Sequence, residues 1–166
     1  MIDFMGGNME AGTIFEYEDN VNELKNIIRK CMNNVQFLEG FNCNNPQISI
    51  EYNNKTGNIR GYLIKDNVRK EIFSLRFERN EIKKFCIAYS LRRHGIGTAI
   101  LKFVIEKYKN SGINEKLCVR PGGYECSHDD FKDCIVDNGK NKYIDQEYRI
   151  EFYKNFEQDL EVIIEN

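Results

Sequence analysis

The chain lacks tryptophan, has only two prolines among its 166 residues, and carries no large excess of charge of one sign. Its formal net charge of −2 excludes the basic footprint of nucleic-acid-binding proteins. No apolar run approaches the roughly 20 residues that a membrane span needs. The 41% of hydrophobic and 30% of charged residues are typical of a globular domain with a real core. We therefore expect neither a nucleic acid nor a membrane as partner.

The six cysteines never occur in the C-x-x-C spacing that structural zinc sites favour. Cys126, His128 and Cys134 come closest, but Cys-x-His-x5-Cys is not a structural zinc spacing, so we expect no metal. Cys86 and Cys118 lie in apolar runs and are expected as small core residues. The first seven residues have neither a basic flank nor a long apolar stretch, which predicts a cytoplasmic protein without a signal peptide.

The amino-terminal part of the chain is expected to form an arm, a strand and a helix. Residues 1–12 are rich in glycine and methionine and show no periodicity, which predicts a flexible arm. Residues 13–18 are expected as a short first strand. Apolar residues at helical spacing then predict an amphipathic helix over residues 21–37.

The middle of the chain is rich in strand-forming residues. Apolar and polar residues alternate there, and short turn-forming sequences separate the alternating runs. Consecutive strands with short connections predict an antiparallel meander. Gly61 interrupts the second strand and predicts a β-bulge. The four predicted strands cover residues 47–52, 59–65, 72–77 and 82–88.

The carboxyl-terminal half alternates helices with short strands. A helix begins at Thr98 and ends near Gly112, and an apolar strand follows at residues 117–119. A strand–helix–strand crossover of this length makes its two strands parallel. Residues 121–145 form a long inserted loop, which we expect to cover a ligand pocket. The last predicted elements are a helix over residues 146–156 and an edge strand over residues 160–164.

A tight turn separates the fourth strand of the meander from the helix that begins at Thr98. Gly95 and Gly97 let the backbone turn sharply and approach a ligand closely. The free N–H groups at the start of the following helix can hold a phosphate or a pyrophosphate. Arg92 and Arg93 add positive charge that suits an anionic ligand. The alternative is an ordinary strand-to-helix turn with no ligand.

The run from Arg92 to Leu101 resembles motif A of the GNAT superfamily, the acyl-CoA-dependent N-acetyltransferases. Its pattern Arg-x-x-Gly-x-Gly follows a strand and opens a helix, as in that family, with Arg93 where a glycine is common. Phe152-Tyr153 is similar to the family's Phe-Tyr pair on the helix after the fifth strand. The Gly-Phe that usually follows is here Phe156 without a glycine.

The resemblance implies a single-domain α/β (α+β) fold over residues 13–166, in which helices flank a mixed, mostly antiparallel central sheet. It also implies that acetyl-CoA is the co-substrate. Backbone groups near Ile87 would pair with the pantetheine arm of acetyl-CoA, in a gap between two splayed strands. The residues that the resemblance assigns to binding the pyrophosphate are Arg92, Arg93, His94, Gly95, Ile96, Gly97 and Thr98.

Two side chains are candidates for the chemistry of amine acetylation. Tyr153 matches the family tyrosine that protonates the departing thiolate, and a phenol with a pKa of about 10 is protonated at neutral pH. The alternative is that Tyr153 only packs on its helix. Glu81, or Glu78 near it, lies where the family often supplies a glutamate as the base. The alternative for both is a solvated carboxylate at a strand end.

We therefore predict an enzyme that transfers an acetyl group from acetyl-CoA to a primary amine of a small molecule or peptide by direct attack. Acidic residues outnumber basic ones over residues 121–147, which hints at a cationic acceptor. A homodimer is a state that the resemblance allows. One alternative is a non-catalytic domain that binds CoA or an acyl-CoA as a sensor or partner module. The other is a plain α/β interaction domain.

Overall fold

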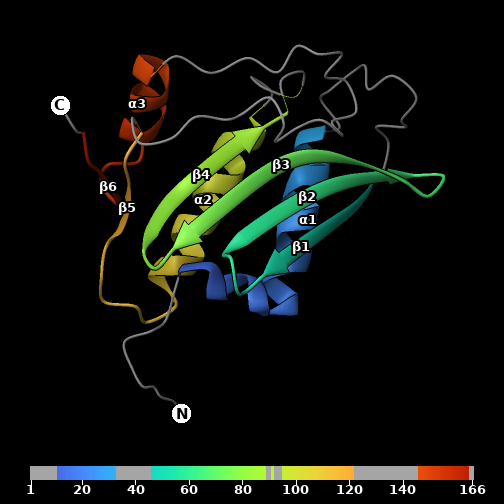
Figure 1. Ribbon diagram of the computed structural model, residues 1–166, viewed down its shortest axis with the longest axis horizontal. Helices are drawn as coiled ribbons and strands as arrows, with labels where there is room; N and C mark the ends of the chain where they lie inside the picture. The colour runs from blue at the N-terminus through green and yellow to red at the C-terminus, as the bar shows by residue number, and fades with distance from the viewer. Residues whose placement is uncertain (1–10, 33–45, 89–90, 92–94, 122–145, 165–166) are drawn as a thin grey trace.

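The structure is a computed structural model that describes residues 11–32, 46–88, 91, 95–121 and 146–164. A six-stranded sheet with the strand order β1-β2-β3-β4-β5-β6 forms its centre (Figure 1). The strands are β1 (Gln47–Asn53), β2 (Asn58–Lys65), β3 (Val68–Glu78), β4 (Glu81–Ile87), β5 (Leu117–Val119) and β6 (Leu160–Val162). The helices are η1 (Ala11–Glu16, a 3-10 helix), α1 (Glu18–Met32), α2 (Ile96–Lys109) and α3 (Gln146–Lys154).

The predicted meander is confirmed, because β1 to β4 pair antiparallel in chain order. Asp66 and Asn67 both have positive φ angles, 52° and 65°, and make the two-residue turn between β2 and β3. The predicted bulge is also found, as a register shift between Gly61 and Tyr62. A Cβ at Gly61 would lie 2.1 Å from Cε1 of Phe73, so only glycine fits there.

The helices α1 and α2 cover one face of the meander (Figure 1). Leu24, Ile28 and Met32 of α1 are fully buried, as their helical spacing predicts. The 3-10 helix η1 closes one end of this core, because the ring of Phe15 lies 6.2 Å from that of Phe103 on α2. The same ring lies 6.3 Å from that of Phe77 on β3. The core therefore forms between one sheet face and these helices, consistent with the predicted fold class.

The prediction of a first strand at residues 13–18 is wrong, because residues 11–16 form η1. Ile14 and Phe15 are adjacent and both buried, which a half-buried strand with alternating sides does not allow. Ala11 and Gly12, which the sequence placed in the arm, are buried in η1, and the Ala11 N–H donates to the Arg79 carbonyl at 2.7 Å. Residues 1–10 lie outside the described ranges.

Several predicted helix ends shift by a few residues. Glu18 and Asp19 occupy the first turn of α1, where acidic side chains suit the helix dipole, so α1 begins before residue 21. Residues 33–37 lie outside the described ranges. Gly95 is the N-cap of α2, so that helix begins at Ile96 rather than Thr98. The helix α3 ends at Lys154, and β6 ends at Val162.

Two parallel connections complete the sheet. The helix α2 joins β4 to β5, and these strands pair parallel, as the crossover predicts. Their ladder holds the pairs Glu81–Cys118 and Ile82–Val119, at the start of β4. The helix α3 then leads to β6, which pairs parallel with β5 and forms the edge of the sheet. Because β5 ends at Val119 while β4 continues to Ile87, the two strands share a ladder over only a short length.

The cysteines of the strands are buried, as expected. Cys86 on β4 is 1% exposed, and Cys118 on β5 is also buried. Cys86 takes part in a disulfide, which its apolar surroundings in the sequence did not predict. Cys31 and Cys118 are free thiols.

The hydroxyl of Tyr108 ties the end of α2 to the chain before β5, because it donates to the Glu115 carbonyl. Burial, together with the Glu115 carboxylate, raises the pKa of Tyr108 to about 12.

A tyrosine pKa that is raised in the folded state contributes stability below the unfolded value of about 10, and this stability is lost as the pH rises toward 12. Between pH 10 and 12, we expect the free energy of unfolding of Tyr108→Phe to fall by roughly 2 kcal/mol less than that of wild type. Urea titrations at stepped pH measure this difference, and parallel curves for the two proteins would contradict it.

Candidate functional site

The start of α2 carries backbone N–H groups that the helix itself does not use. Gly95 caps the helix with φ 82° and ψ 0°, a left-handed conformation that glycine adopts without strain. The first intrahelical hydrogen bond runs from the Ala99 N–H to the Gly95 carbonyl at 3.0 Å. The N–H groups of Ile96, Gly97 and Thr98 therefore have no acceptor within the helix. They point out of the helix start, where its dipole favours an anion.

Gly97 lies where three elements meet. A Cβ placed on it would be 3.6 Å from Cγ1 of Ile87 on β4. It would also be 3.8 Å from Cζ of Phe152 on α3 and 4.0 Å from Cζ of Phe85 on β4. The rings of Phe85 and Phe152 are 6.3 Å apart. An apolar wall from β4 and α3 thus stands directly beside the helix start, and Gly97 and Ile87 lie close together.

Tyr153 follows Phe152 on α3 and is only 2% exposed. Its ring meets that of Phe152 edge to face, with 5.2 Å between the ring centres. Tyr153 therefore belongs to the core and packs on the aromatic side chain that reaches Gly97. The general-acid role of its hydroxyl stays a prediction.

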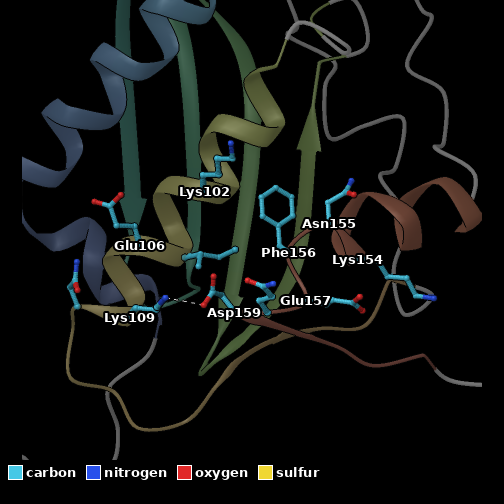
Figure 2. Close-up of a pocket in the computed structure, with 11 residues that line it drawn as sticks. Lys102, Glu106, Lys109, Lys154, Asn155, Phe156, Glu157 and Asp159 are labelled. Atoms are coloured by element: carbon cyan, nitrogen blue, oxygen red, sulfur yellow. Dashed lines mark hydrogen bonds and ion pairs between the residues drawn. The ribbon is translucent and has the colours of Figure 1, made fainter.

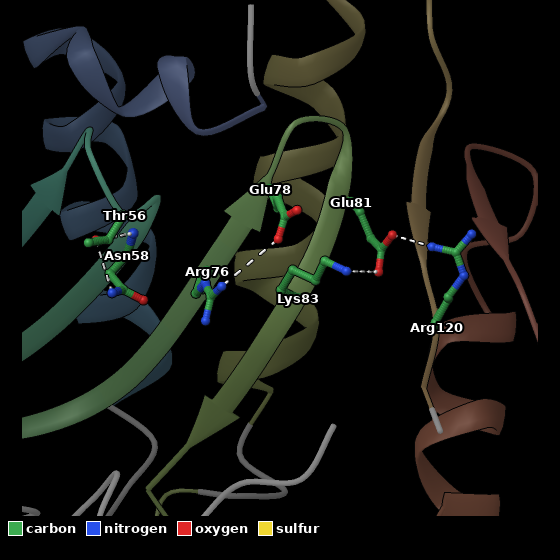
Figure 3. A network of polar contacts seen from close by, with 7 residues as sticks. All are labelled: Thr56, Asn58, Arg76, Glu78, Glu81, Lys83 and Arg120. Carbon is green, nitrogen blue, oxygen red and sulfur yellow. Dashed lines mark hydrogen bonds and ion pairs between the residues drawn. The ribbon is translucent and has the colours of Figure 1, made fainter. Parts of the chain in front are cut away.

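Glu81 stands at the first position of β4 and is held by two cations (Figure 3). One carboxylate oxygen accepts from Arg120, which directly follows β5, and the other lies 3.1 Å from Nζ of Lys83. Glu78 is more exposed and lies 3.9 Å from Nη2 of Arg76. The Glu81 carboxylate therefore has a structural partner on the neighbouring strand, and its role as base stays a prediction.

Cys118 lies beside this network but is not an activated thiol. Burial raises the pKa of Cys118, and the Glu81 carboxylate raises it further, while Arg120 opposes the rise. The thiol is therefore protonated at neutral pH and is a poor nucleophile.

Part of the predicted site lies outside the described ranges. Arg92, Arg93 and His94 of the glycine turn belong to this part. So does most of the predicted loop, with Cys126, His128 and Cys134. Within the described ranges, no three histidine, cysteine, aspartate or glutamate side chains gather closely enough to hold a metal ion.

A polar groove of about 760 Å³ runs between the second half of α2 and the turn after α3 (Figure 2). Lys102 and Glu106 line it from α2, and Phe156 lines it from the turn. Lys109 and Asp159 close one end with an ion pair of 2.9 Å. The groove is separate from the helix start at Gly97, and no local pattern in the sequence predicts it.

The comparisons with known proteins bear on the same residues. The model of the Acetyltransferase (GNAT) family matches residues 23–128, well over half of the chain. The chain belongs to the GNAT family. The matched residues include Gly95, Gly97 and Glu81 but end before α3, so Tyr153 lies beyond them. No curated protein and no solved structure matches the chain.

Membership of the family supports an acetyltransferase, and the family typically uses acetyl-CoA. The six-stranded, mostly antiparallel sheet with its flanking helices is consistent with the GNAT fold. In the described part of the chain, no helix combines the length and the apolar character needed to span a membrane.

Proposed function

We propose that the chain transfers an acetyl group from acetyl-CoA to a primary amine of a small molecule or peptide. The observation that carries this proposal is the start of α2, where free backbone N–H groups and Gly97, which carries no side chain, lie beside the end of β4. Such a helix start suits the pyrophosphate of acetyl-CoA. Arg92, Arg93 and His94 would extend the same binding loop.

The pantetheine arm would leave the helix start along β4. The backbone near Ile87 lies beside Gly97, and the shared ladder of β4 and β5 covers only the start of β4. The arm could therefore extend in the gap where the two strands no longer pair, with Phe85 and Phe152 as an apolar wall. This path brings the thioester toward α3, which carries Tyr153.

The reaction would proceed by direct attack. The amine nitrogen forms a bond to the thioester carbonyl carbon, and the carbon–sulfur bond then breaks. The departing thiolate takes a proton from the Tyr153 hydroxyl, and the amine loses a proton to a base or to water. Glu81 would act as this base only where the pairing with Arg120 and Lys83 opens. The acidic composition of residues 121–147 favours a cationic acceptor.

The direct test is release of free thiol from acetyl-CoA in the presence of a panel of primary amines, polyamines and lysine peptides. We expect thiol release that depends on both enzyme and amine, above the slow hydrolysis seen without an amine. Binding of acetyl-CoA without release for any amine would favour the alternative, a non-catalytic CoA-binding module. Sedimentation of the same samples would decide whether the chain is a homodimer.

A further inference from the structure

The side chain of Arg120, which follows β5, reaches back to Glu81 at the start of β4 and so bridges the two strands (Figure 3). Among the described residues, the ladder of these two strands holds two residue pairs, the second being Ile82 with Val119. Arg120 follows Val119 directly, and its guanidinium donates to the Glu81 carboxylate on β4. This ion pair therefore joins the two strands diagonally across their shared ladder, from the residue after its second pair to Glu81 in its first pair.

This ion pair is less exposed to water than a typical surface pair. The Glu81 side chain is only 13% exposed, while that of Arg120 is 37% exposed. Partial removal from water strengthens the attraction between the charges and reduces screening by salt. Lys83 also contacts the Glu81 carboxylate, but it comes from β4 itself and does not join the strands.

A second contact holds the chain after β5 from the other side. Nε of Arg149 on α3 donates to the Pro121 carbonyl at 3.1 Å. Residues 120 and 121 are thus fixed between β4 and α3. Because β5 has only three residues and its ladder with β4 is short, these side-chain contacts add to the restraint on its position.

We propose that Arg120 is a positioning residue, whose ion pair with Glu81 sets the separation of β4 and β5 and thereby the affinity for the pantetheine arm. This inference rests on the proposed function, since it needs acetyl-CoA to bind between the two strands. In this role Arg120 acts through Glu81.

The test compares two ligands that share the nucleotide part of CoA. Acetyl-CoA carries the pantetheine arm, and 3′-phospho-ADP lacks it. We expect Arg120→Gln to weaken acetyl-CoA binding about three- to tenfold, the range of a partly buried ion pair, without changing the affinity for 3′-phospho-ADP. Arg120→Lys should recover part of the loss. Lys83→Gln is the matched control, because it removes a cation from the same carboxylate, and it should leave both affinities unchanged.

Two further measurements separate positioning from general stability. Arg120→Gln should raise KM for acetyl-CoA about as much as it weakens acetyl-CoA binding. In a Glu81→Gln background, Arg120→Gln should cause no further loss of acetyl-CoA affinity, because the partner is already gone. Equal weakening of both ligands, or additive losses in the double variant, would overturn the proposal.

The wild-type titrations distinguish this proposal from the proposed function. If wild type binds neither ligand, the proposed function fails and the positioning role fails with it. If wild type binds both ligands and Arg120→Gln binds them with the same affinities, the positioning role alone is overturned.

Discussion

Replacing Tyr153 with phenylalanine is expected to lower kcat about 100-fold or more, with the affinity for acetyl-CoA unchanged. The substitution removes one hydroxyl and keeps the ring, so the packing of this 2% exposed side chain against Phe152 is retained. The departing thiolate then has to take its proton from water. Thiol-release kinetics at saturating acetyl-CoA measure the loss, and a calorimetric titration measures the affinity.

Tyr108→Phe is the matched control for this experiment. It removes the same atom from another buried tyrosine, whose hydroxyl binds the Glu115 carbonyl at the far end of α2. We expect kcat to stay within about twofold of wild type. A Tyr153→Phe enzyme with wild-type kcat would show that this hydroxyl supplies no proton in the rate-limiting step.

Replacing Gly97 with glutamate is expected to abolish acetyl-CoA binding, with an affinity loss of roughly 100-fold or more. The new side chain would start within contact distance of Ile87, Phe85 and Phe152 and would fill the space beside the helix start. Its carboxylate would also repel the pyrophosphate at the N–H groups that bind it. Calorimetric titration with acetyl-CoA checks the loss, and circular dichroism checks that the variant is folded.

Gly97→Ala is the matched control, because it changes the same position without adding a large or charged side chain. The nearest atom to the added methyl group would be Cγ1 of Ile87 at 3.6 Å, an ordinary van der Waals distance. Gly97 also has no positive φ angle, so alanine fits its backbone. We expect the alanine variant to bind acetyl-CoA within about fivefold of wild type. A folded glutamate variant with wild-type affinity would contradict the assignment of the binding loop.

Local patterns in the sequence predict most of the fold. The alternation in the meander, the bulge at Gly61 and the parallel crossover to β5 all depend on short-range rules, and each is found. The prediction of a first strand is wrong because Ile14 and Phe15 are adjacent and both buried. Their contacts come from Phe77 and Phe103, which are distant in the sequence, and no local period reveals such packing.

The candidate site, too, can be predicted from the sequence only in part. The glycine turn can be predicted, since the conformation of Gly95 and the free N–H groups follow from the local sequence. The contact of Phe85 and Phe152 beside Gly97 depends on how α3 returns to the sheet, which spacing alone does not specify. Only one local feature of the sequence points to Arg120, which is its position as a cation immediately after an apolar strand. Its pairing with Glu81 requires the parallel register of β4 and β5.

Calorimetric titration of the wild-type chain with acetyl-CoA tests the central claim most directly. The account predicts saturable binding at one site per chain with a dissociation constant of roughly micromolar order. It also predicts that an excess of 3′-phospho-ADP, which competes for the start of α2, weakens the apparent affinity. A folded protein that produces no binding heat at several temperatures, and no protection against thermal unfolding by acetyl-CoA, would contradict the account.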